Sequence, residues 1–161
     1  MLKALIKPAA IAASIAAIIT GASLSNAQAG ETCMQMGGTG MANFVPQDDG
    51  TTTIIASLTG SLATTSGTIT AQRETSSGLE MDMQHYFMTD KGGFIHTRDL
   101  GVLTAVPGKK ERYMIEITYD IQAPASSGVL KGFKGQFKSY GLVDLAKLEG
   151  LVRYSGEICK K

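Results

Sequence analysis

The segment "RYMIEITYDIQ", residues 112–122, alternates between apolar and polar side chains along its length. A repeat of two residues is typical of a half-buried strand, because successive side chains of a strand point to opposite faces. The β-branched isoleucines also favour a strand over a helix. With Met114 as the one exception on the polar face, the apolar face carries Tyr113, Ile115, Ile117, Tyr119 and Ile121.

The same alternation, less regular, predicts further strands on both sides of this segment. They cover residues 52–62, 68–73, 79–88, 94–105, 130–140 and 151–159, and turns rich in Gly, Ser, Asp and Pro separate them. We expect residues 143–148 to connect two strands, and the alternative is a single helical turn. Seven or eight strands about ten residues apart predict one all-β antiparallel domain, either a sandwich or a barrel.

The two cysteines favour the barrel. Cys33 and Cys159 lie close to the two ends of the predicted domain, residues 30–161. The first and last strands of an up-and-down barrel are neighbours, so a disulfide between these cysteines would close it. Two free thiols, or a metal held by the pair, are the alternatives.

Residues 1–29 have the layout of a secretory signal peptide. Two lysines precede a long run of alanine, isoleucine and other small residues, and Ala27-Gln28-Ala29 resembles a cleavage site. The alternative is a membrane anchor, since the apolar run approaches the length that a spanning helix needs. We expect cleavage before Gly30 and a secreted or periplasmic protein, whose compartment permits a disulfide.

Composition excludes several classes of function. The net charge is +1 and the chain has no basic run, so a nucleic-acid partner is not expected. The sequence lacks a phosphate-binding glycine loop, His-x-x-x-His, Cys-x-x-Cys and Gly-x-Ser-x-Gly. We therefore expect neither a cofactor nor a metal, and the partner expected instead is a small hydrophobic ligand. The oligomeric state stays open.

The only two histidines lie in one predicted hairpin, "MQHYFMTDKGGFIHTRD", residues 83–99. If its turn at Lys91-Gly92 has an even number of residues, Phe87 faces His96. One face then carries His85, His96 and Arg98 among large apolar groups and points into the barrel. An odd loop, or a slip of one residue in either strand, separates the two histidines onto opposite faces.

A segment near the carboxyl end carries a family resemblance. "SSGVLKGFKGQF", residues 126–137, resembles the G-x-G-x-F-x-G-x-x-G signature of the allene oxide cyclase-like and dirigent-type barrels. Gly128, Gly132 and Gly135 match glycines of the signature, whereas Ser126 replaces the first one and Leu130 the usual phenylalanine. The resemblance covers the last third of the chain. It implies a small antiparallel barrel with an apolar central cavity, in which some members cyclise or orient hydrophobic molecules.

These observations predict a β-barrel that holds a small hydrophobic or aromatic molecule in its lumen. The barrel would serve as a cofactor-independent isomerase, cyclase or lyase, with His85, His96 and Arg98 as catalytic residues. The expected ligand-binding residues are Tyr113, Tyr119, Met83 and Phe87. The alternatives are a non-catalytic binder that uses the same cavity, and a structural or interaction module whose lumen is filled by its own side chains.

Overall fold

The computed structural model describes residues 30–161, which form a closed antiparallel barrel of eight strands in sequential order. The predicted signal peptide, residues 1–29, lies outside the described residues. The strands are β1 (Thr32–Pro46), β2 (Thr52–Leu58), β3 (Thr64–Thr75), β4 (Gly78–Met88), β5 (Phe94–Ala105), β6 (Arg112–Ile121), β7 (Gln136–Asp144) and β8 (Glu149–Lys160). Two short 3-10 turns, η1 (Ala123–Ala125) and η2 (Gly128–Leu130), lie between β6 and β7.

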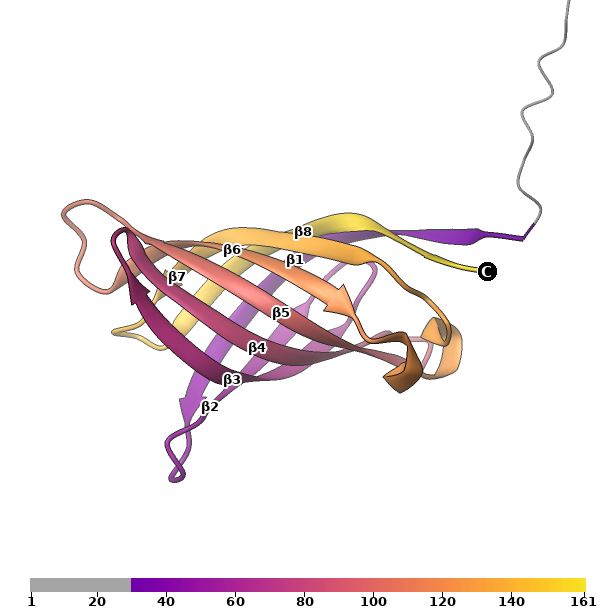
Figure 1. Cartoon of the computed structure of the whole chain (residues 1–161), viewed down its shortest axis with the longest axis horizontal. Coiled ribbons are helices and arrows are strands. Elements are labelled where there is room, and N and C mark those ends of the chain that lie inside the picture. Colours follow the sequence, from indigo (N-terminus) through magenta and orange to yellow (C-terminus); the bar gives the residue numbers. More distant parts are fainter. Residues whose placement is uncertain (1–29) are drawn as a thin grey trace, which may run out of the picture.

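Strand β1 closes the barrel because it pairs on both of its edges. Residues 40–46 of β1 pair with β2, and residues 32–43 pair with β8. Figure 1 shows the first part of β1 and the last part of β8 running out past the barrel as a two-stranded ribbon. Within the barrel each strand has a neighbour on both sides, which removes most of the unpaired sheet edges through which β-rich chains aggregate.

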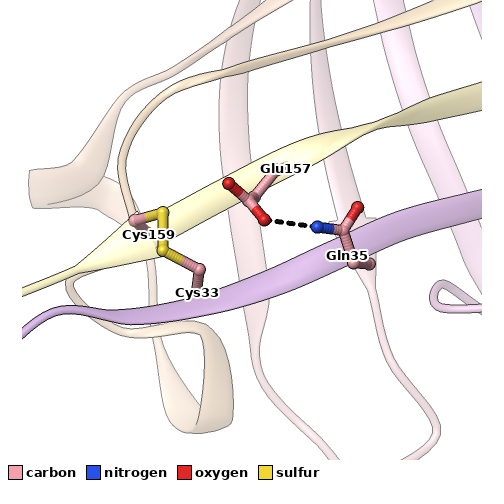
Figure 2. Close-up of a disulfide and its surroundings, with 4 residues drawn as sticks. All are labelled: Cys33, Gln35, Glu157 and Cys159. Carbon is pink, nitrogen blue, oxygen red and sulfur yellow. Dashed lines mark hydrogen bonds between the residues drawn. A yellow bond between two sulfur atoms is a disulfide. The ribbon is translucent and has the colours of Figure 1, made fainter. Parts of the chain in front are cut away.

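The predicted disulfide is present in this ribbon. Cys33 lies directly opposite Cys159 in the β1–β8 register, and a disulfide joins their sulfur atoms. Figure 2 shows the bridge beside a hydrogen bond between Gln35 and Glu157 of the same two strands. The prediction of a single barrel tied by Cys33 and Cys159 is therefore confirmed.

The sequence pattern located most strands closely. The predicted bounds of β5 agree with the structure, and those of β4 and β6 differ by one residue at one end. The strand predicted over residues 68–73 is too short. The corresponding strand β3 runs from Thr64 to Thr75 and carries a bulge between Ile69 and Ala71. No bounds were predicted for β1, because Gly37, Gly38 and Gly40 interrupt the alternation of apolar and polar side chains in this strand.

The predicted strand over residues 130–140 is wrong in its first half. Residues 130–135 belong to the β6–β7 connection, and β7 begins only at Gln136. Gly132 and Gly135 adopt φ angles of 83° and 113°, which the other residues rarely reach and which turn the chain over the barrel end. Leu130 and Phe133 are buried there, so this connection covers one end of the lumen.

That same end is also covered by the β2–β3 loop, residues 59–63. The hydroxyl of Tyr154 donates to the carbonyl of Thr59 at 2.7 Å and accepts the amide of Leu62 at 3.0 Å. Leu62 is 2% exposed. Both the loop and the β6–β7 connection thus close the end at which the described chain starts and finishes (Figure 1). No helix of residues 30–161 is long and apolar enough to cross a membrane.

Candidate lumen site

The β4–β5 hairpin has an odd loop, so the expected pairing of its side chains is wrong by one residue. Five residues, 89–93, connect Met88 to Phe94. His85 therefore lies opposite Thr97, and Tyr86 lies opposite His96. This is the alternative register in which the two histidines point to opposite faces of the sheet.

His85 points into the barrel and binds a carboxylate there. Its Nδ1 lies 2.6 Å from Oδ2 of Asp99, which also points inward from β5. The side chains are 3% and 0% exposed respectively. A carboxylate that accepts from Nδ1–H fixes the imidazole tautomer and leaves Nε2 as the basic nitrogen. The geometry is that of a histidine base oriented by a buried acid.

A glycine on the neighbouring strand makes room for the imidazole. Gly67 of β3 lies directly opposite His85. A Cβ atom at this position would lie 2.3 Å from Cδ2 and 2.6 Å from Nε2 of His85. Since real Cβ atoms do not approach other atoms so closely, the ring occupies space that only glycine leaves open.

An aromatic cluster surrounds the buried pair. The ring of His85 lies 5.5 Å from that of Phe87 and 5.6 Å from that of Tyr119. Tyr119 stacks on Phe137 with centroids 4.6 Å apart, and Phe87 meets both rings edge to face. These side chains fill the lumen at the level of the pair, so this half of the barrel is a packed core.

The hydroxyl of Tyr119 is held inside this cluster. It lies 3.0 Å from Oγ of Ser139, and both residues are buried. Burial raises the pKa of Tyr119, against a smaller opposing effect of the Ser139 hydrogen bond, and the nearby Asp99 carboxylate raises it further. The phenol therefore stays protonated at neutral pH and can donate a hydrogen bond.

The other half of the lumen contains an apolar cavity. About 40 Å³ of it is open to the centre of a water-sized molecule. His85, Tyr119, Tyr154 and Thr65 supply its polar side chains. The remaining wall is apolar and consists of Ala42, Phe44, Ile54, Ala56, Leu58, Met81, Met83, Phe87, Leu103, Ile115, Ile117, Val143, Gly150 and Val152.

The structure brings only some of the predicted site residues together. His85, Met83, Phe87 and Tyr119 line the cavity. Tyr113 is half-buried at the edge of the core and is not among the lining residues.

His96 and Arg98 point outward, which contradicts the expectation that they share the lumen with His85. His96 stacks on Tyr86 with ring centroids 4.5 Å apart, and Arg98 is exposed. The physical reason is the odd hairpin loop, which reverses every side chain of β5 relative to the expected register.

Asp99 is the site residue that sequence reasoning missed. The expected even-loop register, which turns His85 and Arg98 inward, places the neighbouring Asp99 on the opposite face. Its buried Oδ1 atom has no hydrogen-bond partner among residues 30–161, and neither has Oγ1 of Thr97 beside it on β5. Because the hairpin register alone decides which residues of β5 face His85, only a correct loop length could have revealed the pair.

One group of residues offers donor atoms close enough together for a metal ion. Within the part of the chain that the structure describes, this group is Cys33, Glu157 and Cys159. Both sulfur atoms are bonded to each other, so they are not thiolates and do not act as metal ligands here. The arrangement does not fit a metal site.

Comparison of the chain with protein-family models, with curated proteins and with solved structures finds no match.

Proposed function

We propose that the barrel binds a small, mostly apolar molecule in the open half of its lumen. The observation that carries this proposal is the pairing of an apolar cavity with a few polar groups at its inner end, namely His85 and Tyr119. Ligand sites are typically apolar pockets with a small number of polar groups that orient the ligand. These two side chains are suited to form hydrogen bonds with a carbonyl or hydroxyl group of the ligand.

The cavity limits what can bind. A ligand that does not fit the room described above has to displace side chains of the wall. Met81 and Met83 both line the cavity, and methionine is the apolar residue that adapts its shape most easily. The expected ligand is therefore compact and has at most one or two polar atoms. The resemblance of residues 126–137 to the allene oxide cyclase-like barrels supports the same kind of ligand.

The proposed location of the protein is an oxidising compartment outside the cytoplasm. The disulfide between Cys33 and Cys159 supports this location, because such bridges persist where thiols are not kept reduced. Secretion or export to the periplasm would follow cleavage before Gly30, which sequencing of the amino terminus of the natural protein would test.

Binding can be tested with p-cresol, a compact phenol, by NMR titration of isotopically labelled protein. We expect saturable shift changes at the amides of Met83, His85 and Tyr119. The variant Ala56→Leu places a larger side chain in the cavity and should abolish these changes. Ser57→Leu adds the same side chain to the exposed outer face and should preserve them.

Two results of the p-cresol titration would rule out lumen binding. If p-cresol shifts none of these amides, or shifts them equally in the Ala56→Leu variant, the lumen does not take up such a molecule. The barrel would then be a structural or interaction module with a self-filled lumen.

A second candidate function is proton transfer to and from a bound carbonyl compound. The specific observation in its favour is the His85–Asp99 hydrogen bond, because an oriented histidine is a common general base. Nε2 of His85 would take a proton from the carbon next to a carbonyl group. The protonated hydroxyl of Tyr119 would stabilise the enolate oxygen, and return of the proton to another position would complete an isomerisation.

Deuterium exchange from heavy water into cyclopentanone tests this second function. We expect the protein to accelerate exchange over buffer, and His85→Gln to lower the acceleration by at least about a hundredfold. His96→Gln is the matched control, since His96 lies outside the lumen, and should keep the full rate. Equal exchange with and without the wild-type protein would leave the barrel as a binder only.

A further inference from the structure

Four exposed apolar side chains form a continuous row across the outer face of four neighbouring strands. Met41 lies opposite Leu151, Leu151 opposite Leu142, and Leu142 opposite Met114. Their exposed fractions are 69%, 59%, 52% and 52% from Met41 to Met114. Single exposed apolar residues are ordinary, but a contiguous set marks an interaction surface. We call this set the apolar row.

A row of polar residues flanks the apolar row on each side. The first polar row, towards the β7–β8 turn, consists of Asn43, Glu149, Asp144 and Arg112. The second polar row, on the other side, consists of Thr39, Arg153, Tyr140 and Glu116. On each strand, the two polar residues are four positions apart in the chain, with the apolar residue midway between them.

The two polar rows are complementary to each other in charge. On β8, Glu149 and Arg153 lie at equal distances on either side of Leu151. On β6, Arg112 and Glu116 lie in the same way on either side of Met114. A two-fold axis that runs along the apolar row exchanges the two polar rows between two copies of the molecule. Glu149 then faces Arg153 of the partner subunit, and Arg112 faces Glu116 of the partner subunit.

We propose that this face is the interface of a two-fold symmetric dimer whose axis runs along the apolar row. Such an interface is self-complementary, as a closed two-fold dimer requires. The other two-fold axis within this face, parallel to the strands, would place Glu149 against Asp144 of the partner subunit. That arrangement opposes like charges, so the charge pattern selects the first axis.

The surface shape supports the same arrangement. A hollow of about 490 Å³ lies beside the apolar row, towards the first polar row, and Ala42, Val143 and Gly150 form part of it. The axis sets this hollow against the long side chains of Tyr140 and Arg153 of the partner subunit. The row ends in methionines, whose length and flexibility suit the place where two convex barrels curve apart.

The ion pairs within one molecule leave donor and acceptor groups available for contacts across the proposed interface. Arg112 donates through Nε to Asp144 at 2.8 Å, which leaves its terminal N–H groups for a second carboxylate. Glu116 accepts from Lys138 through Oε1 alone at 2.8 Å. Arg153 forms no ion pair with any of residues 30–161.

Charge reversal tests both the dimer and its axis, with sedimentation velocity over a concentration series as the measurement. The wild-type protein should sediment as a monomer–dimer equilibrium. Glu149→Arg alone, or Arg153→Glu alone, places like charges opposite each other and should weaken the dimer at least tenfold. The double variant Glu149→Arg/Arg153→Glu restores both contacts and should dimerise, and so should an equal mixture of the two single variants.

A matched control lies on the opposite side of the barrel. Met88 of β4 is 42% exposed, and Met88→Lys should leave the dimer intact, whereas Leu142→Lys should abolish it. Circular dichroism of each variant establishes that it folds. The proposal is overturned if the wild-type protein is monomeric at all concentrations or forms another oligomer. It is also overturned if the single reversals have no effect, or if the double variant and the mixture fail to dimerise.

Discussion

At the scale of the residue, the most consequential feature is a buried histidine beside a buried carboxylate. His85 and Asp99 lie in a barrel core whose other residues are mostly apolar. Removing a charged group from water costs several kcal/mol, and the partner offsets this cost only when the geometry is good. The pair is therefore expected to reduce stability relative to an apolar core and to serve the lumen site instead.

Replacing one member of the pair should cost more than replacing both. His85→Leu leaves the Asp99 carboxylate buried without its partner and should lower the free energy of unfolding by about 3–5 kcal/mol. His85→Leu/Asp99→Val removes both polar groups and should recover most of that loss. Urea denaturation of wild type, both single variants and the double variant measures the coupling. Additive losses in the double variant would contradict a direct interaction between the two residues.

The glycine beneath the imidazole gives a second prediction at this scale. Gly67→Ala introduces a methyl group into the space of the His85 ring and should lower the free energy of unfolding by about 1–3 kcal/mol. It should also shift the NMR signals of the His85 imidazole. Gly37→Ala is the matched strand control, because no atom lies within 4 Å of its added Cβ. Equal stability of the two alanine variants would argue against the tight contact between Gly67 and His85.

The buried phenol predicts how stability depends on alkaline pH. Burial raises the pKa of Tyr119 above that of an unfolded tyrosine, which is about 10. The unfolded state then releases a proton that the folded state keeps, so the free energy of unfolding falls as pH rises above about 10. Tyr119→Phe should show a smaller fall over this range in urea denaturation at several pH values. An identical alkaline profile in the variant would show that Tyr119 ionises normally.

At the scale of the element, the β4–β5 hairpin shows why the site could be predicted only in part. Its inward residues on β5 include Thr97, Asp99 and Gly101, whereas the exposed face carries Leu100 and Val102. The outward face is thus as apolar as the inward one, and side-chain pattern alone favours the wrong register. The loop decides the register, and Gly92 and Gly93 both adopt positive φ in a five-residue turn that glycines permit but do not specify.

The β1–β8 ribbon supports a prediction about closure. The disulfide joins residues 126 positions apart and should contribute about 4–5 kcal/mol by restricting the unfolded chain. The variant Cys33→Ser/Cys159→Ser should be less stable by this amount in urea denaturation, with an unchanged β circular-dichroism spectrum, since backbone pairing of β1 with β8 persists. A variant as stable as the oxidised wild type would show that the bridge adds nothing to closure.

At the scale of the whole molecule, the closed barrel follows from features that the sequence displays openly. Regular alternation in β6, short turns and one cysteine near each end of the domain suffice to predict a single disulfide-tied barrel. Which half of the lumen is open could not be predicted, because it depends on how far the chain folds over one end. Residues 130–135 look like strand in sequence, yet they bury Leu130 and Phe133 across that end.

Lumen binding, as proposed here, means that the open half of the barrel holds a small, mostly apolar molecule. The most direct measurement is mass spectrometry of small molecules released by denaturation from protein purified under native conditions from its natural source, with the Ala56→Leu variant expressed there in parallel. We predict that the wild-type protein releases one compact, mostly apolar compound in near-stoichiometric amount and that the variant releases none. Release of no compound from the wild-type protein, or of the same amount from both proteins, would show that the lumen holds no such molecule.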